Sequence, residues 1–450
     1  MFTTVAMLGL GATSRSSKSS KPSNPGQSLP VFLYTSAKTY DPAAWIGGGE
    51  RFPQGATIVV ADKKGRRPLA PSFAASADAT VSFDGKRVLF AGKQSASSPW
   101  QIWEIPVEGG DPHRITSCTE DCVRPFYLPE DRLVYAHKVN GRFTIEATTL
   151  TPGKPLPLTY SPGNFFPTDV LRDGRILFEA ARPFGDSPTA ELYTVYSDGS
   201  GVESYRCDHG HNRHSGKQIG SGDIVFVLGR GLARFTSALA HEVEIKAPAG
   251  DYAGDVVELP SGDWLVPWRP EPGNPFVLKL WKPGAKSLRS VASKPGVNAV
   301  QPVLLGQRPA PNRHPSGLHD WQTANLLCLN AYTSKYPLAD GAIATVRLYS
   351  MNSLGRPQAL GTAPVEHDGS FFLQIPADQP VQLELLDRSG RTLKKEAGWF
   401  WLRRGEQRVC VGCHAGPETA PENAVPAILL RSTTPADMTG TTTDAKTGGH

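Results

Sequence analysis

Short apolar strands, each preceded by a turn that contains Asp or Gly, recur along the chain between Phe73 and Val291. Three clear copies of this pattern are followed by two weaker ones: Phe83–Phe90, Pro129–Tyr135, Arg172–Phe178, Gly222–Phe226 and Ser261–Val266. The copies follow one another at intervals of about 40 to 48 residues, which is the length of a four-stranded propeller blade. The pattern therefore predicts a repeating, mainly β architecture.

A second strand follows the first in two copies, at Gln101–Ile105 and Glu191–Val195, and each is followed by a glycine-containing turn. These residues resemble the TolB-type propeller repeat, in which an Ile-Trp strand and an Asp-Gly turn are followed by a Pro-Asp-Gly hairpin. A propeller must close its ring, because an open ring leaves sheet edges unpaired. We expect Pro30–Tyr34 and Ala56–Ala61 to pair with Ala299–Leu305 in a closing blade, which gives six blades. A β-sandwich with coincidental spacing is the alternative.

The pattern changes after a proline-rich segment. Four alternating strands are predicted there, at Asn325–Ala331, Ala342–Tyr349, Ser370–Ile375 and Val381–Leu386, and they fit a small β-sandwich. The expected fold is therefore mainly β, a six-bladed TolB-like β-propeller followed by this sandwich. The expected boundaries are 1–30 for an export signal and linker, 31–306 for the propeller, 307–322 for a linker, 323–430 for the sandwich and 431–450 for a disordered tail.

Length and composition agree with two β domains. The chain has 450 residues, whereas single cores stop growing at roughly 250–300 residues. Its 45 glycines and 40 prolines are typical of a turn-rich β protein. The net charge is +5, but Lys and Arg form no basic stripe, so we expect no nucleic-acid partner.

The N-terminus has features of an export signal. Met1–Ala12 is an apolar run that ends in small residues, and a stretch rich in Ser, Lys and Pro follows it. A basic start is missing from this run, so a frayed apolar terminus is the alternative. No other stretch has the roughly 18 uncharged apolar residues of a membrane-spanning helix, so we expect the mature chain to lack one.

The six cysteines fall into distinct settings. Cys118 and Cys122 could close a small disulfide loop or remain two thiols. Cys328 lies in an apolar run, which predicts a buried thiol. Cys410 and Cys413 alone have a spacing with a specific chemical meaning.

Cys410, Cys413 and His414 form a Cys-x-x-Cys-His motif. Two thiols with this spacing can add to both vinyl groups of one porphyrin, and the adjoining imidazole can then take one axial position on the iron. We therefore expect one covalent haem c with His414 as the proximal ligand, in a periplasmic or secreted protein. The alternatives are a redox dithiol, which would need a βαβ setting, and half a zinc site, which would need a second ligand pair.

Several segments ahead of the motif carry a family resemblance: Ala363–Phe372, Ile375–Asp378, Leu385–Asp387 and Arg404–Glu406. Together with the motif they resemble the middle domain of the hydrazine synthase alpha-subunit family, and the propeller ahead of them matches that family's order of domains. The resemblance implies that a Tyr four residues after the motif His can bind the iron while the His binds another metal. The matching residue here is Glu418, so we expect His414 to bind the iron.

The second axial position of the iron is expected to be empty or weakly occupied. Met438 and His367 are the candidate distal ligands. Met438 lies in a Thr/Gly-rich segment, and ordering that segment would cost about 1–2 kcal/mol per residue. His367 lies beside a turn, where an exposed residue is expected. The aromatic residues 399–401 are expected to line the haem surface or to form a core strand.

A second group of metal-binding residue types lies at a predicted blade turn and comprises Cys207, His209, His211 and His214. A thiolate and imidazoles this close could hold a second metal ion or face the haem. Solvated loop histidines are the alternative.

Three functions fit these features. The first is electron transfer, with the propeller docking a redox partner protein or a small-molecule electron donor or acceptor. The second is a haem oxidoreductase that acts on a small nitrogen or oxygen compound, so the sequence leaves open whether the protein is an enzyme. The third is a propeller that binds a protein or glycan while the haem is structural.

Overall fold

A computed structural model describes residues 29–440 of the chain apart from residues 152, 183–188, 207–209, 238–239, 292–293, 335, 353–354, 397 and 414–422. The predicted export signal therefore lies almost entirely outside the described residues. None of the helices in the described part of the chain has the length and hydrophobicity needed to span a bilayer.

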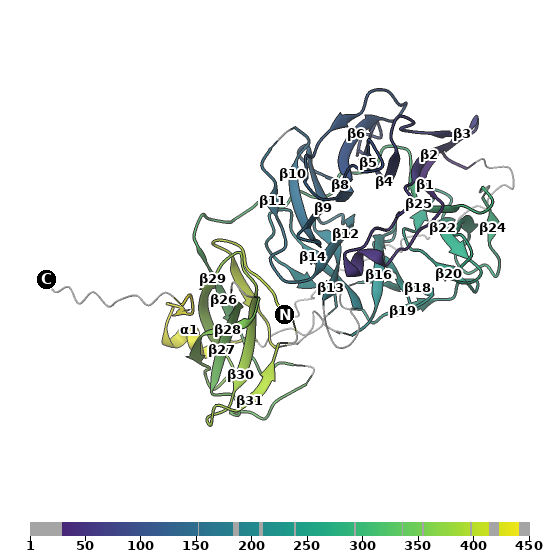
Figure 1. The fold of residues 1–450 in the computed structure, drawn as a ribbon. Coiled ribbons are helices and arrows are strands. Elements are labelled where there is room, and N and C mark those ends of the chain that lie inside the picture. The colour runs from purple at the N-terminus through teal and green to yellow at the C-terminus, as the bar shows by residue number, and fades with distance from the viewer. Residues whose placement is uncertain are drawn as a thin grey trace, which may run out of the picture.

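Within the described residues, six sheets from the first two-thirds of the chain form a ring (Figure 1). Blade 1 contains β25 (Asn298–Leu304), β1 (Phe32–Ala37), β2 (Thr57–Asp62) and β3 (Gly65–Pro68). Blade 2 contains β4 (Ala75–Val81), β5 (Arg87–Lys93), β6 (Gln101–Pro106) and β7 (His113–Arg114). Blade 3 contains β8 (Cys122–Leu128), β9 (Arg132–Val139), β10 (Arg142–Thr149) and β11 (Leu156–Pro157).

The other three blades follow the same order. Blade 4 contains β12 (Asn164–Val170), β13 (Ile176–Arg182), β14 (Thr189–Val195) and β15 (Glu203–Ser204). Blade 5 contains β16 (Arg213–Gln218), β17 (Ile224–Leu228), β18 (Gly231–Phe235) and β19 (Val243–Ile245). Blade 6 contains β20 (Asp251–Tyr252), β21 (Val257–Glu258), β22 (Trp264–Arg269), β23 (Val277–Trp281) and β24 (Arg289–Ser290). A short 3-10 helix, η1 (Ala44–Gly47), lies between β1 and β2.

The closing blade is confirmed. Strand β1 pairs in an antiparallel register with both β2 and β25, so the first and last strands of the propeller share one sheet. The innermost strands are buried along most of their length, whereas outer strands such as β3, β7 and β24 are short and exposed. The apolar copies in the sequence are second strands such as β5 and β9, whose central residues are buried, whereas the outer strands are polar because they form the exposed edges.

Charged residues from different blades meet near the axis of the ring. Asp78 of blade 2, Arg124 of blade 3 and Asp255 of blade 6 all have a positive φ, at points where the inner strands are irregular. Arg124 forms ion pairs with both carboxylates. Burial raises the pKa of Asp78, but Arg51 and Arg124 outweigh that effect and lower it below its ordinary value. These buried charges are therefore paired across the ring, as buried charges must be.

The C-terminal region is a two-layer β-sandwich beside the ring (Figure 1). Its first sheet contains β32 (Gln407–Cys410), β26 (Thr323–Cys328), β29 (Phe371–Pro376) and β33 (Ala436–Asp437). Its second sheet contains β28 (Pro357–Pro364), β27 (Thr345–Met351), β30 (Val381–Leu386) and β31 (Thr392–Lys395). Buried residues from both sheets, such as Leu326 and Val346, form one apolar core. One short helix, α1 (Ala427–Arg431), follows β32.

The prediction of a disordered tail over 431–450 is wrong for its first ten residues. Strand β33 pairs with the edge of β29, and Met438 donates its backbone N–H to the Gln374 carbonyl at 2.8 Å. The Met438 side chain is 2% exposed and belongs to the sandwich core. Free backbone groups at a sheet edge and a gap in the core offset the entropy cost that the prediction was based on. Residues 441–450 lie outside the described residues.

Candidate haem-attachment site

The motif begins where an edge strand of the sandwich ends. Strand β32 runs parallel to β26 and places Cys410 directly beside Cys328. Cys410 and Cys413 are both half-buried and pack against the sandwich core. His414 lies outside the described residues. The structure therefore brings the two motif thiols together at one end of the first sheet.

Two neighbouring segments hold the motif turn in place. A Cβ atom at Gly412 would lie 2.1 Å from the Thr333 carbonyl oxygen, so only glycine fits at this position. On the other side, Lys394 of β31 donates a hydrogen bond to the Cys413 carbonyl oxygen at 3.1 Å. The same ammonium group donates to the Ser334 hydroxyl. The thiols are thus displayed on a turn that is fixed before any group is attached.

Cys328 is a buried thiol, as predicted, with a side chain that is 3% exposed. Burial raises the pKa of this thiol well above its ordinary value, and the neighbouring Cys410 and Cys413 raise it further. A thiol that stays protonated is a poor nucleophile. Cys328 is therefore a structural residue of the core next to the motif and not a reactive thiol.

Large apolar side chains are exposed on this domain. Val409 is 56% exposed next to Cys410, and Tyr336 is 74% exposed within 5.9 Å of the Lys394 ammonium. Val425 and Leu430, which follow the motif, are 63% and 75% exposed. Of these residues, Tyr336 is connected to the motif turn through Lys394, which contacts both the Tyr336 ring and the Cys413 carbonyl oxygen. Half-buried thiols with the Cys-x-x-Cys spacing beside apolar surface fit a covalently bound haem.

The two candidate distal ligands lie in different places. Met438 follows β33, at the opposite edge of the first sheet from β32, which corresponds to three inter-strand spacings of about 4.8 Å each. The thioether of Met438 packs inside the sandwich core, so the structure does not bring Met438 to the motif. His367 is exposed on the turn between β28 and β29. That turn lies at the motif end of the sheet, because Phe371 at the start of β29 pairs with Cys328.

The predicted aromatic lining of the haem is wrong for Trp401. This side chain is fully buried among residues of blades 3 and 4, with its ring 6.0 Å from that of Phe165 and 6.4 Å from that of Tyr160. The side chains of Trp399 and Phe400 are half-buried. Trp401 therefore anchors the sandwich on the propeller.

Polar contacts bring the motif strand close to blade 4. The Glu406 carboxylate accepts the Gly201 backbone N–H at 3.1 Å, and Arg408 donates to the Val202 carbonyl at 2.8 Å. These propeller residues lie a few positions before Cys207 in the chain. Gly201 and Val202 follow the end of β14, whereas Gly210 and Asn212 of the predicted Cys/His segment contact Glu191 and Ala190 at its start, so the described part of that segment lies at the opposite end of blade 4.

That predicted group is only partly described. Cys207 and His209 lie outside the described residues, and His211 is exposed. His214 lies on β16, and burial lowers its pKa to about 4, so it is neutral near pH 7. Its Nδ1 atom lies 3.1 Å from the Ser215 hydroxyl. Nothing among the described residues joins His211 and His214 in one metal site.

A different group was missed from the sequence. Among the described residues, one set of three His, Cys, Asp or Glu side chains is close enough to hold a metal ion, and it comprises Cys118, Cys122 and His137. The two cysteines form a disulfide, which decides between the two alternatives left open above. His137 lies directly opposite Cys122 in the β8–β9 hairpin. The hairpin turn near Pro129 was visible in the sequence, but a register shift between Val123 and Phe126 moves the partner of Cys122 by one residue, so the turn alone does not give this pairing.

Comparison with known proteins gives one family match and one close fold. Residues 334–415 match the family described as hydrazine synthase alpha subunit middle domain. Hydrazine synthase from Kuenenia stuttgartiensis superposes with a TM-score of 0.77 at 17% identity, over 90% of this chain and 72% of that chain. TolB from Acinetobacter baumannii gives a TM-score of 0.47 at 16% identity, over 61% of this chain and 66% of that chain. No curated protein matches the sequence significantly.

These comparisons confirm the resemblance predicted from the sequence. The chain has the fold of the Kuenenia stuttgartiensis protein over nearly all of its length, and its mainly β architecture is as expected. The sandwich of this protein, with the Cys-x-x-Cys motif at its end, matches the hydrazine synthase alpha-subunit middle domain.

Proposed function

We propose that this chain is an exported redox protein that carries one haem c on Cys410 and Cys413 and transfers electrons. The observation that supports this most directly is the pair of half-buried thiols at the end of β32, next to exposed apolar side chains. The propeller, fixed to the sandwich through Trp401, would serve as the docking platform for a redox partner.

The roles of the residues follow from their chemistry. Each motif thiol adds across one vinyl group, so the S–H bond breaks and a C–S bond forms with no leaving group. The attached group supplies one-electron iron chemistry. Lys394 and Gly412 fix the turn that presents the thiols, and His414, which follows Cys413 directly in the sequence, would supply the imidazole for the iron.

Export is supported by the Cys118–Cys122 disulfide. Disulfides form and persist in oxidising compartments and are rare in the cytosol. Attachment of haem c also takes place outside the cytoplasm, so the disulfide and the motif point to the same compartment. We propose the periplasm or the exterior of the cell as the location of this protein.

A second candidate function is an oxidoreductase for a small nitrogen or oxygen compound. The burial of Met438 at the far edge of the sheet favours it, because that thioether is then not available as a second axial ligand. A vacant axial position would let a small molecule reach the iron. The name of the family points to nitrogen chemistry, but a shared fold does not carry an activity with it.

The test is expression of the full chain with a cytochrome c maturation system, followed by a denaturing gel stained for haem. We expect stain on the parent chain and on Cys328→Ala, and no stain on Cys410→Ala with Cys413→Ala. An unstained parent chain would overturn the proposal. Carbon monoxide then separates the two functions: a low-spin spectrum that the gas does not change supports electron transfer, and a shifted spectrum supports the oxidoreductase.

A further inference from the structure

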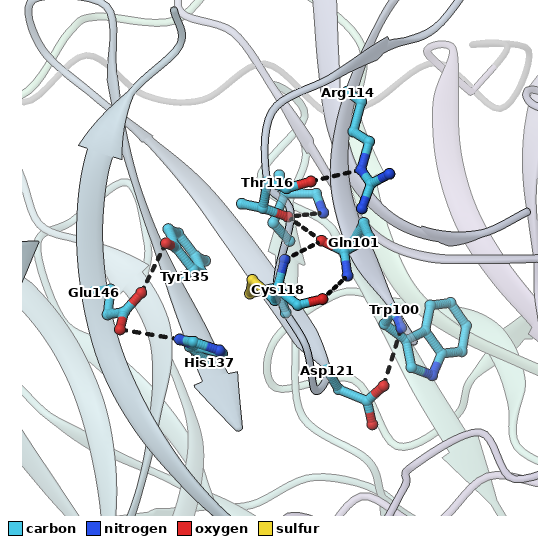
Figure 2. The surroundings of a disulfide bond; sticks show 11 residues. Trp100, Gln101, Arg114, Thr116, Cys118, Asp121, Tyr135, His137 and Glu146 are labelled. Atoms are coloured by element: carbon cyan, nitrogen blue, oxygen red, sulfur yellow. Dashed lines mark hydrogen bonds and ion pairs between the residues drawn. A yellow bond between two sulfur atoms is a disulfide. The ribbon is translucent and has the colours of Figure 1, made fainter. Parts of the chain in front are cut away.

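The disulfide of the propeller lies beside a histidine whose position is fixed. Cys122 begins β8 and is fully buried, and it lies directly opposite His137 of β9 in the antiparallel register. The two sulfur atoms and one imidazole nitrogen of His137 all lie within 4.8 Å of one another. Figure 2 shows the imidazole of His137 between the Glu146 carboxylate and Cys118.

Glu146 sets the orientation of the imidazole. Its Oε1 atom lies 3.0 Å from Nδ1 of His137, while its Oε2 atom accepts the Tyr135 hydroxyl at 2.8 Å. An ionised carboxylate can only accept hydrogen bonds, so Nδ1 carries the proton and Nε2 of the neutral ring presents a lone pair. Nε2 is buried and has no hydrogen-bond partner among the described residues. A carboxylate, an imidazole and an open lone pair in this order are typical of a metal-binding histidine.

The backbone of both cysteines is held by contacts other than the disulfide. The buried amide of Gln101 accepts the Cys118 backbone N–H at 2.8 Å and donates to the Cys118 carbonyl at 2.9 Å. Cys122 donates its N–H to the Trp100 carbonyl at 2.8 Å. The Cα atoms of the two cysteines are 6.3 Å apart. If the S–S bond breaks, both sulfur atoms therefore stay next to His137.

We propose that reduction of the Cys118–Cys122 disulfide creates a zinc site made of two thiolates and Nε2 of His137. A dithiol reductant supplies two electrons and two protons, the S–S bond breaks, two thiols form and the reductant becomes a disulfide. Zn²⁺ then displaces both thiol protons, and one coordination position remains for water. In a tetrahedral site, Zn–S bonds of about 2.3 Å and a Zn–N bond of about 2.0 Å separate the ligand atoms by about 3.5–3.8 Å.

This arrangement makes the propeller a redox-dependent zinc binder. Two thiolates and an imidazole favour zinc over magnesium or calcium, which prefer oxygen ligands. The disulfide form has no thiolates and does not hold the ion. Zinc in turn stabilises the reduced form, because it binds that form and not the other. The proposal is independent of the haem, since none of its residues belongs to the motif.

The test titrates zinc against a chromophoric chelator, using the full chain before and after anaerobic treatment with a phosphine reductant. The comparison set is the parent, Cys118→Ser, His137→Gln and, as a matched control, the exposed histidine variant His113→Gln. Near-ultraviolet circular dichroism checks that each variant is folded. Zinc bound to the motif cysteines is the same in every reduced member of the set and cancels between those samples.

The proposal expects the reduced parent to bind one zinc ion more than the reduced Cys118→Ser variant, and the untreated parent and untreated Cys118→Ser to bind equal amounts. His137→Gln should weaken that additional site at least 10-fold, and His113→Gln should leave it unchanged. Equal zinc stoichiometry in the reduced parent and Cys118→Ser would overturn the proposal. Unweakened binding in a folded His137→Gln chain would also overturn it, because the imidazole would then not be a ligand.

Discussion

The propeller and the sandwich each contain a pair of closely spaced cysteines, and the two pairs differ in their surroundings. In the propeller, Cys118 and Cys122 are bonded to each other next to the half-buried imidazole of His137. In the sandwich, Cys410 and Cys413 lie at the end of an edge strand, half-buried and next to exposed apolar side chains. The second pair lies at the end of an edge strand, whereas the first pair is held in a blade beside an imidazole. The two pairs therefore offer different ligands to whatever binds them.

The junction between the two regions should give the largest effect. Trp401 is fully buried against blades 3 and 4, and we expect Trp401→Ala to lower the free energy of unfolding by about 3–5 kcal/mol. The sandwich should then unfold in a transition separate from that of the propeller. Denaturant unfolding followed by fluorescence and by circular dichroism measures this. Trp321→Ala is the control, because Trp321 is 55% exposed, and a similar loss in both variants would mean that Trp401 is no anchor.

Within the sandwich, Met438→Ala should lower the free energy of unfolding by about 2–5 kcal/mol, because the thioether is part of the core. The absorbance spectrum of the haem-loaded chain should not change. Met351→Ala, at the end of β27, is the matched control. Conversion of a low-spin to a high-spin spectrum in Met438→Ala would show that this methionine binds the iron, and would contradict the placement of the tail.

Within the propeller, replacing both Cys118 and Cys122 with serine should lower the free energy of unfolding by about 2 kcal/mol, the value expected for a short disulfide loop. The parent chain treated with a reductant should lose a similar amount in the absence of zinc. Thermal unfolding of both samples provides the measurement. If the reductant destabilises the serine variant as well, the effect comes from elsewhere in the chain.

A further prediction for the propeller concerns pH. Burial raises the pKa of Glu179, in blade 4, to about 8, so the native state retains a proton that the unfolded chain releases above about pH 4.5. Stability should therefore fall as pH rises from about 4.5 to 8, by up to about 1.4 kcal/mol per pH unit. Glu179→Gln should flatten this dependence, and the exposed Glu108→Gln should not. Equal slopes in the parent and Glu179→Gln would exclude a buried neutral carboxyl.

The repeating features of the fold were predictable from the sequence. The blade spacing and the closing pair of strands are confirmed, because each blade repeats the same local pattern and a ring has to close. Four sandwich strands, β26, β27, β29 and β30, were likewise visible as alternating segments, whereas β28, β31, β32 and β33 were not predicted. The haem site remains a prediction, which rests on the local spacing of two thiols and an imidazole.

Features that depend on distant packing were not predictable. Met438 looked unconstrained because its neighbours are Thr and Gly, and its contacts come from strands that precede it by many residues. Trp401 looked like part of a haem surface because its partners belong to the propeller. His137 was overlooked because its relation to Cys122 comes from strand register rather than sequence spacing.

The central claim is that the sandwich cysteines, and not those of the propeller, carry the haem. The most direct measurement is the amount of haem per chain from a pyridine spectrum, after co-expression with a cytochrome c maturation system. The chains compared are the parent, a variant with Cys410→Ala and Cys413→Ala, and a variant with Cys118→Ser and Cys122→Ser. We predict one covalent haem in the parent and in the propeller variant, and none in the sandwich variant. A parent chain without covalent haem, or a sandwich variant that retains it, would contradict the account.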